Sequence, residues 1–413
     1  MSEWLKNTLT LSDACRITKP LRFNMMFKPI GSLCNLNCTY CYYLDKADIY
    51  GKESKMPLVV LEKCIKEYLE INDSEEITFD WHGGEPLLLG LDYFENIVEL
   101  QRKYKGNKKI FNTVQTNATL LNADFASFFK NNNFLLGVSI DGPRSVHDKY
   151  RKDKGDIPTF DKVLKGIELL HRYGVDFNTL TTINKASEGR GLEVYDFLKR
   201  IESRYMQFMP VVEYVNKKTN KITSPDDEDA MLTSWSVSPV EYGNFMCEIF
   251  DYWVRNDVGE YFVNLFDSTL ANYCGMNPGT CVYSETCGSN AIVEHNGDVY
   301  PCDHYVYPKY KLGNIKTMSL NEIVGSDEMT KFGINKRNML PSKCLRCRYY
   351  FACHGECPKH RFDKTSNGNN GMNSLCQGLY GFFSHTEPYM IEMRELYFSG
   401  KSPSEIMCWK PKC

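Results

Sequence analysis

The sequence predicts an α/β protein: a partial (β/α)6 barrel, then a small, loop-rich and cysteine-rich domain, and finally a C-terminal helix. Up to residue 260, short apolar or β-branched runs alternate with longer segments of helical period, which is typical of parallel strands joined by helices. After that point the chain becomes rich in Gly, Asn, Pro and Cys, and few segments keep a regular apolar period. We therefore expect a barrel domain over 20–260, a second domain over 261–380 and a helical tail over 381–413.

Six short runs have the length and composition of buried strands, and segments of helical period follow them. The predicted strands are 23–29, 77–81, 110–116, 134–140, 177–183 and 205–211. The predicted helices are 58–71, 92–104, 122–132, 159–173, 190–202 and 239–255. No GxGxxG motif follows the first strand, so the pattern favours a barrel over a dinucleotide-binding sheet. In such barrels the loops that follow the strands carry the chemistry.

Charge and hydropathy exclude several classes of partner. The net charge is -3, and the basic runs at 102–109 and 149–154 are short, so we interpret them as solvated and expect no nucleic acid. The first 23 residues contain no unbroken apolar run of signal-peptide length, and no stretch of about 18 apolar residues occurs elsewhere. We therefore expect a cytoplasmic protein without a membrane partner, in which the 17 cysteines bind metal or react rather than form disulfides.

A loop with three cysteines, CNLNCTYC, directly follows the first predicted strand. It contains Cys34, Cys38 and Cys41, whereas a structural zinc site or a closed iron–sulfur cluster uses four ligands. Three thiolates on a 4Fe-4S cluster leave one iron open, and an open position distinguishes a catalytic metal site from a structural one. Three core thiols, or a zinc site with a distant fourth ligand, are the alternatives.

With the aromatic Tyr40 before Cys41, this loop resembles the signature of the radical S-adenosylmethionine enzymes, CxxxCxφC with φ aromatic. The resemblance covers most of the chain. It implies that Cys34, Cys38 and Cys41 bind the cluster and that the open iron binds the amino and carboxylate groups of S-adenosylmethionine. One electron from the cluster then cleaves the cofactor to a 5′-deoxyadenosyl radical.

Motifs after later strands strengthen this resemblance. WHGGEP follows the second strand, SIDGP follows the fourth, and HDKYR comes shortly after it. By resemblance, the GGEP backbone approaches the methionine amino group, while a serine and an arginine help to hold the ribose and the carboxylate. Gln115 is a predicted substrate contact, and His82 has no assigned role because cofactor binding and packing both remain open. The predicted cofactor-binding residues are Tyr40, Gly83, Gly84, Glu85, Ser139 and Arg151.

Eight further cysteines lie between residues 281 and 376, and their spacing resembles the SPASM extension of radical S-adenosylmethionine enzymes. That resemblance implies two auxiliary 4Fe-4S clusters, and therefore three clusters in the whole chain. A zinc ribbon is the alternative, and Cys274 competes with Cys281 as a ligand. The inner set would be Cys281, Cys287, Cys302 and Cys357, and the outer set Cys344, Cys347, Cys353 and Cys376.

Among the SPASM enzymes the chain most resembles the anaerobic sulfatase-maturating enzymes, which oxidise a sulfatase cysteine or serine to Cα-formylglycine. The marker is YPCDHY, in which Asp303 matches the base proposed for that group. The resemblance implies that the 5′-deoxyadenosyl radical takes a hydrogen atom from Cβ. Asp303 then accepts a proton as general base, and an auxiliary cluster accepts the second electron. A helix-capping aspartate is the alternative role.

The implied partners are an unfolded or nascent sulfatase segment with a (C/S)xPxR motif and a small electron donor such as flavodoxin or ferredoxin. Cysteine and serine substrates both remain open. One other function is a SPASM enzyme that forms thioether or other crosslinks in a ribosomal peptide, although only 33 residues precede Cys34 to hold a leader-binding domain. Another is an electron carrier with three clusters and no catalysis.

Overall fold

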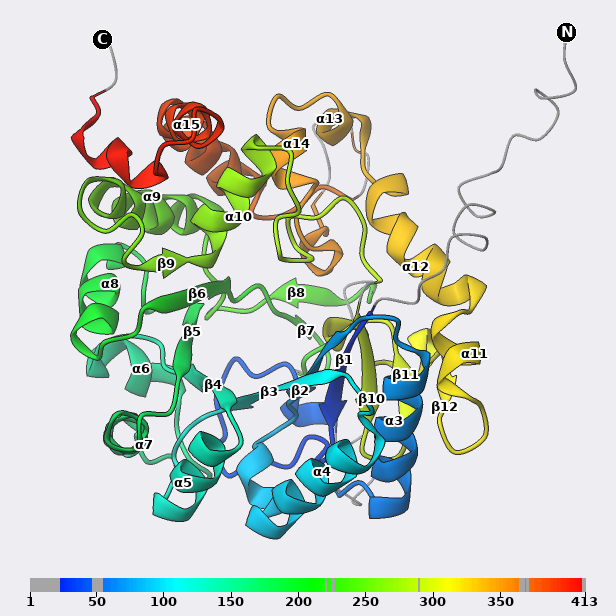
Figure 1. Ribbon diagram of the computed structural model, residues 1–413. Helices are drawn as coiled ribbons and strands as arrows, with labels where there is room; N and C mark the ends of the chain where they lie inside the picture. Colours follow the sequence, from blue (N-terminus) through cyan, green and yellow to red (C-terminus); the bar gives the residue numbers. More distant parts are fainter. Residues whose placement is uncertain are drawn as a thin grey trace, which may run out of the picture.

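The computed structural model describes residues 23–46, 55–219, 221–223, 227–288, 290–363, 368 and 371–410. Residues 20–22 and 411–413 of the predicted domains lie outside the described residues. All six predicted strands form, and they lie side by side in chain order as parallel neighbours (Figure 1). They are β1 (Asn24–Lys28), β2 (Glu76–Trp81), β3 (Lys109–Thr116), β4 (Phe134–Ser139), β5 (Phe177–Ile183) and β6 (Tyr205–Pro210). The predicted α/β fold is confirmed.

Helices cover the outer face of this sheet, as predicted (Figure 1). Aromatic side chains of β1 and β2 pack against α3: the ring of Tyr68 lies 5.1 Å from that of Phe79, and Phe79 stacks on Phe27 at 5.4 Å. The short helix α6 (Arg144–Tyr150) was not predicted, because seven residues are too few for a periodic signal. The expected helices are α3 (Leu58–Ile71), α4 (Leu91–Tyr104), α5 (Ala123–Asn131), α7 (Phe160–Tyr173), α8 (Gly191–Arg200) and α9 (Pro239–Asn256).

The sheet continues beyond the six barrel strands at both edges, so that the described residues form a ten-stranded sheet. At one edge β9 (Phe262–Val263) pairs with β6, and at the other β10 (Asn290–Glu294) runs parallel to β1. Next to β10 follow β11 (Asp298–Tyr300) and β12 (Gly313–Asn314), both antiparallel to their neighbours. Three of these strands have only two or three residues, too few for the sequence pattern to show, and the five-residue β10 lies in a stretch with few periodic segments. Because β10 pairs with β1 and β11 pairs with β10, the chain that follows β11 lies next to the β1 edge of the barrel.

The remainder of the cysteine-rich region consists of short helices and loops. Its helices are α10 (Asn264–Tyr273), α11 (Leu320–Val324), α12 (Asp327–Asn338), α13 (Ser342–Leu345) and α14 (Tyr350–Cys353). The helical C-terminus is confirmed: α15 (Cys376–Phe398) packs along α9. A side chain at Gly378 would lie 1.8 Å from the Pro239 carbonyl oxygen, so only glycine permits this close helix contact. The domain limits at 260 and 380 remain predictions.

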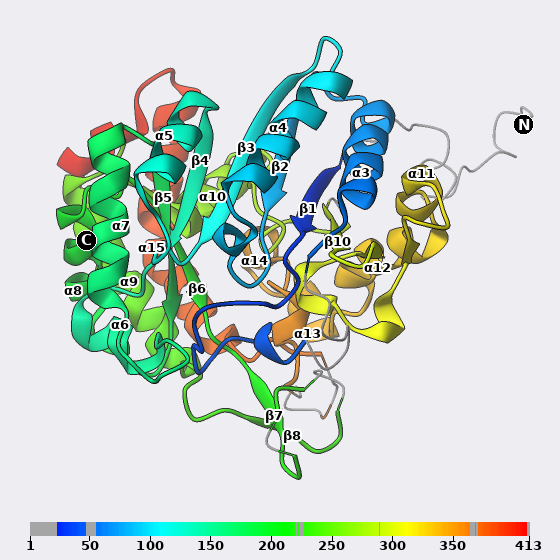
Figure 2. The same cartoon turned by 90° about the horizontal axis from the view of Figure 1, so that it is seen from below.

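A hairpin of β7 (Tyr214–Asn216) and β8 (Ala230–Leu232) follows the last barrel strand. It projects from the molecule at the end where the loop after β1 also lies (Figure 2). The rings of Tyr214 and Phe362 lie 4.0 Å apart, so the hairpin contacts the cysteine-rich region. Among the described residues, no helix is long and apolar enough to cross a membrane.

Candidate active site

The loop after β1 brings the three cysteines of CNLNCTYC into one buried cluster. Cys34, Cys38 and Cys41 pack there with the apolar side chains of Leu36 and Val211. Burial raises the pKa of the Cys34 thiol to about 11 and that of Cys38 to about 12, and the nearby Cys41 adds to both shifts. The three thiols therefore lie close together on one loop, as the sequence predicts.

Backbone hydrogen bonds hold this loop against the segment after α6. The Asn37 N–H donates to the Lys152 carbonyl at 2.8 Å, and the Thr39 N–H donates to the Tyr150 carbonyl at 3.1 Å. These bonds involve no side chain of the loop. The cysteine side chains remain available for ligands.

The glycines after β2 dock the GGEP loop onto the segment before Cys34. The Gly84 N–H donates to the Gly31 carbonyl at 2.8 Å, and a side chain at Gly84 would lie 2.1 Å from the Leu33 carbonyl oxygen. Gly83 has φ +127°, a conformation that favours glycine. The structure thus explains both glycines by contacts within the chain. Their contact with a cofactor remains a prediction.

Glu85 connects the GGEP loop to the end of β3. Its side chain is fully buried and accepts hydrogen bonds from the Leu87 N–H at 3.0 Å, the Thr116 hydroxyl at 2.7 Å and the Asn117 N–H at 2.8 Å. Burial raises the pKa of the carboxyl to about 7, although these donors oppose the shift. Both oxygens are thus engaged within the chain, and the predicted cofactor contact of Glu85 remains a prediction.

Tyr40 and Arg151 meet at Asp141, a residue of SIDGP to which the sequence assigned no role. The Tyr40 hydroxyl donates to Asp141 Oδ2 at 2.5 Å, and Arg151 Nε lies 3.0 Å from Asp141 Oδ1. Arg151 is 6% exposed, so the prediction of a solvated basic run at 149–154 is wrong for this residue. The buried carboxylate offsets the charge of the guanidinium, and composition alone could not reveal this partner.

Gln115 and Ser139 lie on adjacent strands and bind each other. The Gln115 amide donates from Nε2 to Ser139 Oγ at 2.9 Å. A side chain at Gly137 would lie 2.1 Å from Gln115 Oε1, so this glycine leaves space for the glutamine. The predicted substrate contact and a predicted cofactor contact are therefore neighbours at the ends of β3 and β4.

Asp303 lies at the end of β1, although it belongs to the distant YPCDHY motif. It is the first residue of η4 (Asp303–Tyr305), which follows β11. One carboxylate oxygen pairs with the fully buried ammonium of Lys28, and the other accepts a hydrogen bond from the Tyr42 hydroxyl. Burial raises the pKa of Asp303, but the attraction of the paired Lys28 ammonium holds that pKa below its usual value. The carboxylate is thus ionised.

The sequence missed both partners of Asp303. Lys28 ends the otherwise apolar strand NMMFK, and a charged residue at that position was the available signal. Its ammonium also lies 3.6 Å from the centre of the Tyr43 ring, and the Tyr43 hydroxyl donates to Glu294 at 2.6 Å. Glu294 stands opposite Lys28 in the β1–β10 register. The paired strands therefore present a connected set of buried polar groups at this edge.

His82, whose role the sequence left open, lies near Asp303. Its Nδ1 accepts a hydrogen bond from the Gly83 N–H at 2.9 Å, which leaves the proton of the neutral ring on Nε2. Burial lowers the pKa of the imidazole to about 4, against the attraction of Asp303. His82 is therefore a neutral residue beside the carboxylate.

Among the eight cysteines after residue 280, the thiols that influence one another's pKa belong to the same one of the two predicted sets. In the first, burial raises the pKa of the Cys302 and Cys357 thiols, and Cys287 is among the neighbours that raise both further. Cys281 likewise adds to the raised pKa of Cys287, which burial brings to about 11. Cys281, Cys287, Cys302 and Cys357 are thus electrostatic neighbours, and their ligation remains a prediction.

The second group consists of Cys344, Cys347, Cys353 and Cys376. Burial raises the pKa of Cys353 to about 12, with Cys344 and Cys376 among the neighbouring thiols that contribute. Cys347 adds to the raised pKa of Cys376. Burial also raises the pKa of Cys274, but the charged neighbour that influences this pKa is Arg394 and not another cysteine. This placement favours Cys281 over Cys274 as the ligand.

A buried ion pair joins the barrel to the cysteine-rich region. Glu213, just after β6, pairs with Lys359, which follows Cys357 by two residues. The Lys359 ammonium also lies 4.5 Å from the centre of the Tyr42 ring. The sequence could not indicate this contact, because its partners are 146 residues apart. Asp303 and Tyr42 are thus adjacent to the contact between the two regions.

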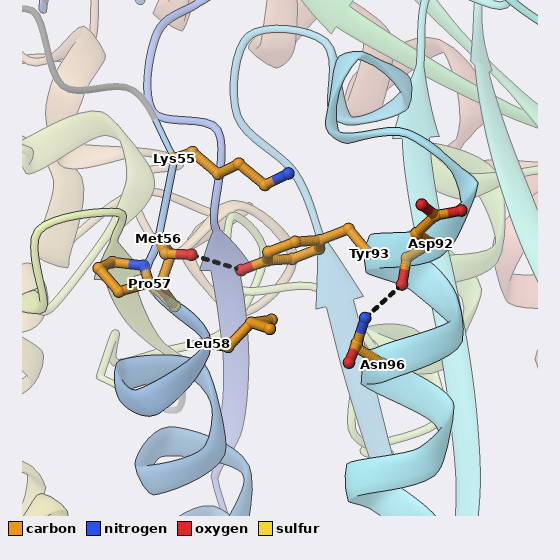
Figure 3. Close-up of a pocket in the computed structure, with 7 residues that line it drawn as sticks. All are labelled: Lys55, Met56, Pro57, Leu58, Asp92, Tyr93 and Asn96. Atoms are coloured by element: carbon orange, nitrogen blue, oxygen red, sulfur yellow. Dashed lines mark hydrogen bonds between the residues drawn. The ribbon is translucent and has the colours of Figure 1, made fainter.

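A hollow of about 330 Å³ lies elsewhere, between the segment before α3 and the first turns of α4 (Figure 3). The Tyr93 hydroxyl donates to the Met56 carbonyl at 3.0 Å across it, and the Lys55 ammonium lies 5.0 Å from the Tyr93 ring. No predicted site residue lines this hollow. It is separate from the residues assembled around the cysteine loop.

Comparison with known proteins agrees with this arrangement. The sequence matches the family described as "Radical SAM superfamily" over residues 29–198 and the "Iron-sulfur cluster-binding domain" over residues 281–348. It is 44% identical over 394 residues to the serine-type anaerobic sulfatase-maturating enzyme of Bacteroides thetaiotaomicron, covering 94% of this chain and 95% of that protein. The chain belongs to the anaerobic sulfatase-maturating enzymes.

Further relatives include both substrate types of this family. The cysteine-type anaerobic sulfatase-maturating enzyme of Clostridium perfringens is 33% identical, with 90% of this chain and 98% of that protein covered. The solved structure "Native anSMEcpe with bound AdoMet" has a TM-score of 0.79 at 31% identity, covering 90% of this chain and 99% of that one. The predicted family, fold and enzyme class, a radical S-adenosylmethionine oxidoreductase that uses iron–sulfur clusters, are confirmed.

Proposed function

We propose that this enzyme oxidises an active-site cysteine or serine of a sulfatase to Cα-formylglycine (3-oxoalanine). The observation that carries the proposal is the position of Asp303, an ionised carboxylate at the end of β1, next to Cys302 of the inner cysteine group. Family membership supports sulfatase maturation, and the placement of Asp303 supports its role as the base that this oxidation requires.

The cysteine groups fit three 4Fe-4S clusters. Thiolates are the ligands that iron–sulfur clusters use, and binding to iron would release the protons that burial keeps on these thiols. Cys34, Cys38 and Cys41 would hold the cluster that binds S-adenosylmethionine. Tyr40 and Arg151, fixed on Asp141, and the GGEP backbone at Gly83 and Gly84 would border that cofactor. The two groups of four would hold the auxiliary clusters.

Oxidation of CH₂OH or CH₂SH to the aldehyde level removes two electrons and two protons. When bound, the cofactors supply a 5′-deoxyadenosyl radical that takes one hydrogen atom from the substrate Cβ, and an acceptor for one electron. Asp303 takes the remaining proton, from the substrate hydroxyl or thiol, onto a carboxylate oxygen. For a cysteine substrate, water then converts the thioaldehyde to the aldehyde and sulfide leaves.

The neighbours of Asp303 set its charge and its orientation. The ammonium of Lys28 keeps the carboxylate ionised and the Tyr42 hydroxyl fixes its orientation, although the ion pair also makes the carboxylate a weaker base. The neutral ring of His82 leaves the carboxylate without a second full positive charge. These three side chains come from two segments of the barrel that converge on one residue of the cysteine-rich region.

The proposed partner is an extended, unfolded or nascent sulfatase segment with a (C/S)xPxR motif, bound between the barrel mouth and the cysteine-rich region. Contacts between Tyr214 and Phe362, and between Glu213 and Lys359, join the two regions there. A related structure, "Native anSMEcpe with bound AdoMet and Cp18Cys peptide", contains a peptide. A small one-electron donor such as flavodoxin or ferredoxin would reduce the first cluster.

The test is anaerobic incubation of the reconstituted enzyme with S-adenosylmethionine, a reductant and a synthetic (C/S)xPxR peptide. We expect 5′-deoxyadenosine together with a peptide whose mass has changed from thiol or hydroxyl to aldehyde. A peptide with alanine at the reactive position is the matched control. Cofactor cleavage with no change in the mass of either reactive peptide would contradict the proposal.

A further inference from the structure

The sulfur of Cys34 accepts a hydrogen bond from the side-chain amide of Asn117. We propose that Asn117 is a positioning residue that raises the reduction potential of the cluster at Cys34 by donating an N–H···S hydrogen bond from its side-chain amide. This inference rests on the proposed function, because it requires that Cys34 bind a cluster. It assigns a role to the residue directly after β3, which the reaction described above does not use.

The amide lies within bonding distance of the sulfur. Asn117 Nδ2 is 3.7 Å from Cys34 Sγ and 2.9 Å from Asn35 Oδ1, so its two N–H groups have two acceptors. The Leu36 N–H also donates to Cys34 Sγ, at 3.3 Å. The sulfur of Cys34 therefore receives one donor from its own loop and one from the barrel.

The orientation of the amide is fixed by its oxygen. Asn117 Oδ1 accepts hydrogen bonds from the Thr119 N–H at 3.0 Å and from the Thr119 hydroxyl at 2.7 Å. Because a carbonyl oxygen accepts and an NH₂ group only donates, the nitrogen must face the other way, toward Cys34. The Asn35 amide closes this set by donating to the Thr119 hydroxyl at 2.8 Å.

The backbone of Asn117 is equally constrained. The residue directly follows β3, is 7% exposed, and donates its N–H to the fully buried carboxylate of Glu85 at 2.8 Å. The donor is thus anchored to the sheet, while the acceptor sits on the loop. A donor fixed in this way keeps its direction when the charge on the sulfur changes, so it can influence the reduction potential of the cluster.

The physical effect follows from charge. Reduction adds an electron to the cluster and its thiolates, and a hydrogen-bond donor to a ligating sulfur stabilises that added negative charge. The donor therefore raises the reduction potential. A cluster with a higher potential is easier to reduce, so more of it is ready to transfer an electron to the cofactor.

The test is the potential of the SAM-responsive cluster in the anaerobic holoenzyme, measured by a redox titration that follows the EPR signal altered by added S-adenosylmethionine. Asn117→Leu keeps the side-chain volume but removes the donor. At a fixed solution potential, we expect its ratio of reduced to oxidised cluster to fall about threefold to tenfold, where tenfold equals about 59 mV for one electron. Asn117→Asp retains the shape and should shift the potential in the same direction by more, because it adds a negative charge.

The matched control is Asn112→Leu. Asn112 is also on β3, is 6% exposed, and binds the Trp81 and Gln101 side chains instead of a thiol. We expect its potential to equal that of the wild type. An unchanged potential in both Asn117 variants at full iron content, or equal shifts at Asn112 and Asn117, would overturn this inference alone. A wild-type enzyme without a SAM-responsive cluster would overturn it together with the proposed function.

Discussion

The two cysteine regions of this protein differ in what holds their thiols in place. In the first, residues 34–41 are fixed by backbone hydrogen bonds to residues 150–152 and by the close packing of Gly84 on Leu33. In the second, the thiols come from segments between 281 and 376 that are joined by loops and by helices as short as α13 and α14. Backbone contacts within the barrel therefore hold the first set of thiols, whereas bound clusters would stabilise the second.

The largest expected effect comes from replacing one cysteine in each of the two regions. Cys34→Ala should abolish cleavage of S-adenosylmethionine while the melting temperature changes little, because the chain holds the loop. Cys357→Ala should lower the melting temperature by about 10 °C or more, because its cluster would crosslink the fold. Activity assays and thermal unfolding of the anaerobic proteins measure both.

Iron analysis accompanies these variants. The wild type should contain about twelve iron atoms and as many sulfides, and each cysteine variant about four fewer. Equal losses of melting temperature in the two variants would remove the distinction between the regions. About four irons together with zinc in the wild type would replace the auxiliary clusters by a zinc site.

The next effect concerns the residue that connects the regions. Asp303→Asn should slow peptide oxidation about 10²- to 10⁴-fold, because the amide cannot accept the proton, and should change cofactor cleavage far less. Single-turnover assays that follow both products measure the two rates. Asp298→Asn is the control, a buried carboxylate on β11 that pairs with Lys311 instead. Equal slowing of both reactions in Asp303→Asn would exclude the role of base.

The smallest effect tests the buried supports of the first region. His147 accepts a hydrogen bond from the Asp141 N–H at 3.4 Å, and its other ring nitrogen lies 3.1 Å from the Thr159 hydroxyl. Burial lowers its pKa to about 3, against about 6.5 in an unfolded chain. Between these values only the unfolded state binds the proton. This stability contribution is therefore present above pH 6.5 and is lost as the pH falls toward 3.

His147→Gln removes this titration. We expect the wild-type free energy of unfolding to fall by about 0.7 kcal/mol more than that of the variant between pH 7 and pH 6. Urea unfolding at the two pH values measures the difference. His171→Gln is the control, since this histidine lies on the exposed part of α7. Identical pH dependence in the wild type and His147→Gln would show that His147 titrates alike in both states.

The sequence by itself determined the order of the six barrel strands, the helices between them and the loop with three cysteines. These features depend on the period and spacing of neighbouring residues, which a local pattern records. The division of the eight later cysteines into two sets came from the family resemblance and stays a prediction. The strands β9, β11 and β12 were missed because two or three residues carry no period, and the five-residue β10 was missed in a stretch with few periodic segments.

Only the tertiary structure decided which side chains meet at the site. Lys28 and Asp303 are 275 residues apart in the chain, and they pair because β10 lies parallel to β1. Arg151 is buried rather than solvated because it pairs with Asp141, which lies two residues after β4. The direction of the Asn117 amide depends on Thr119 and Glu85 together. In each case the physical reason is the same: a buried charge or amide is defined by partners that packing brings from distant parts of the chain.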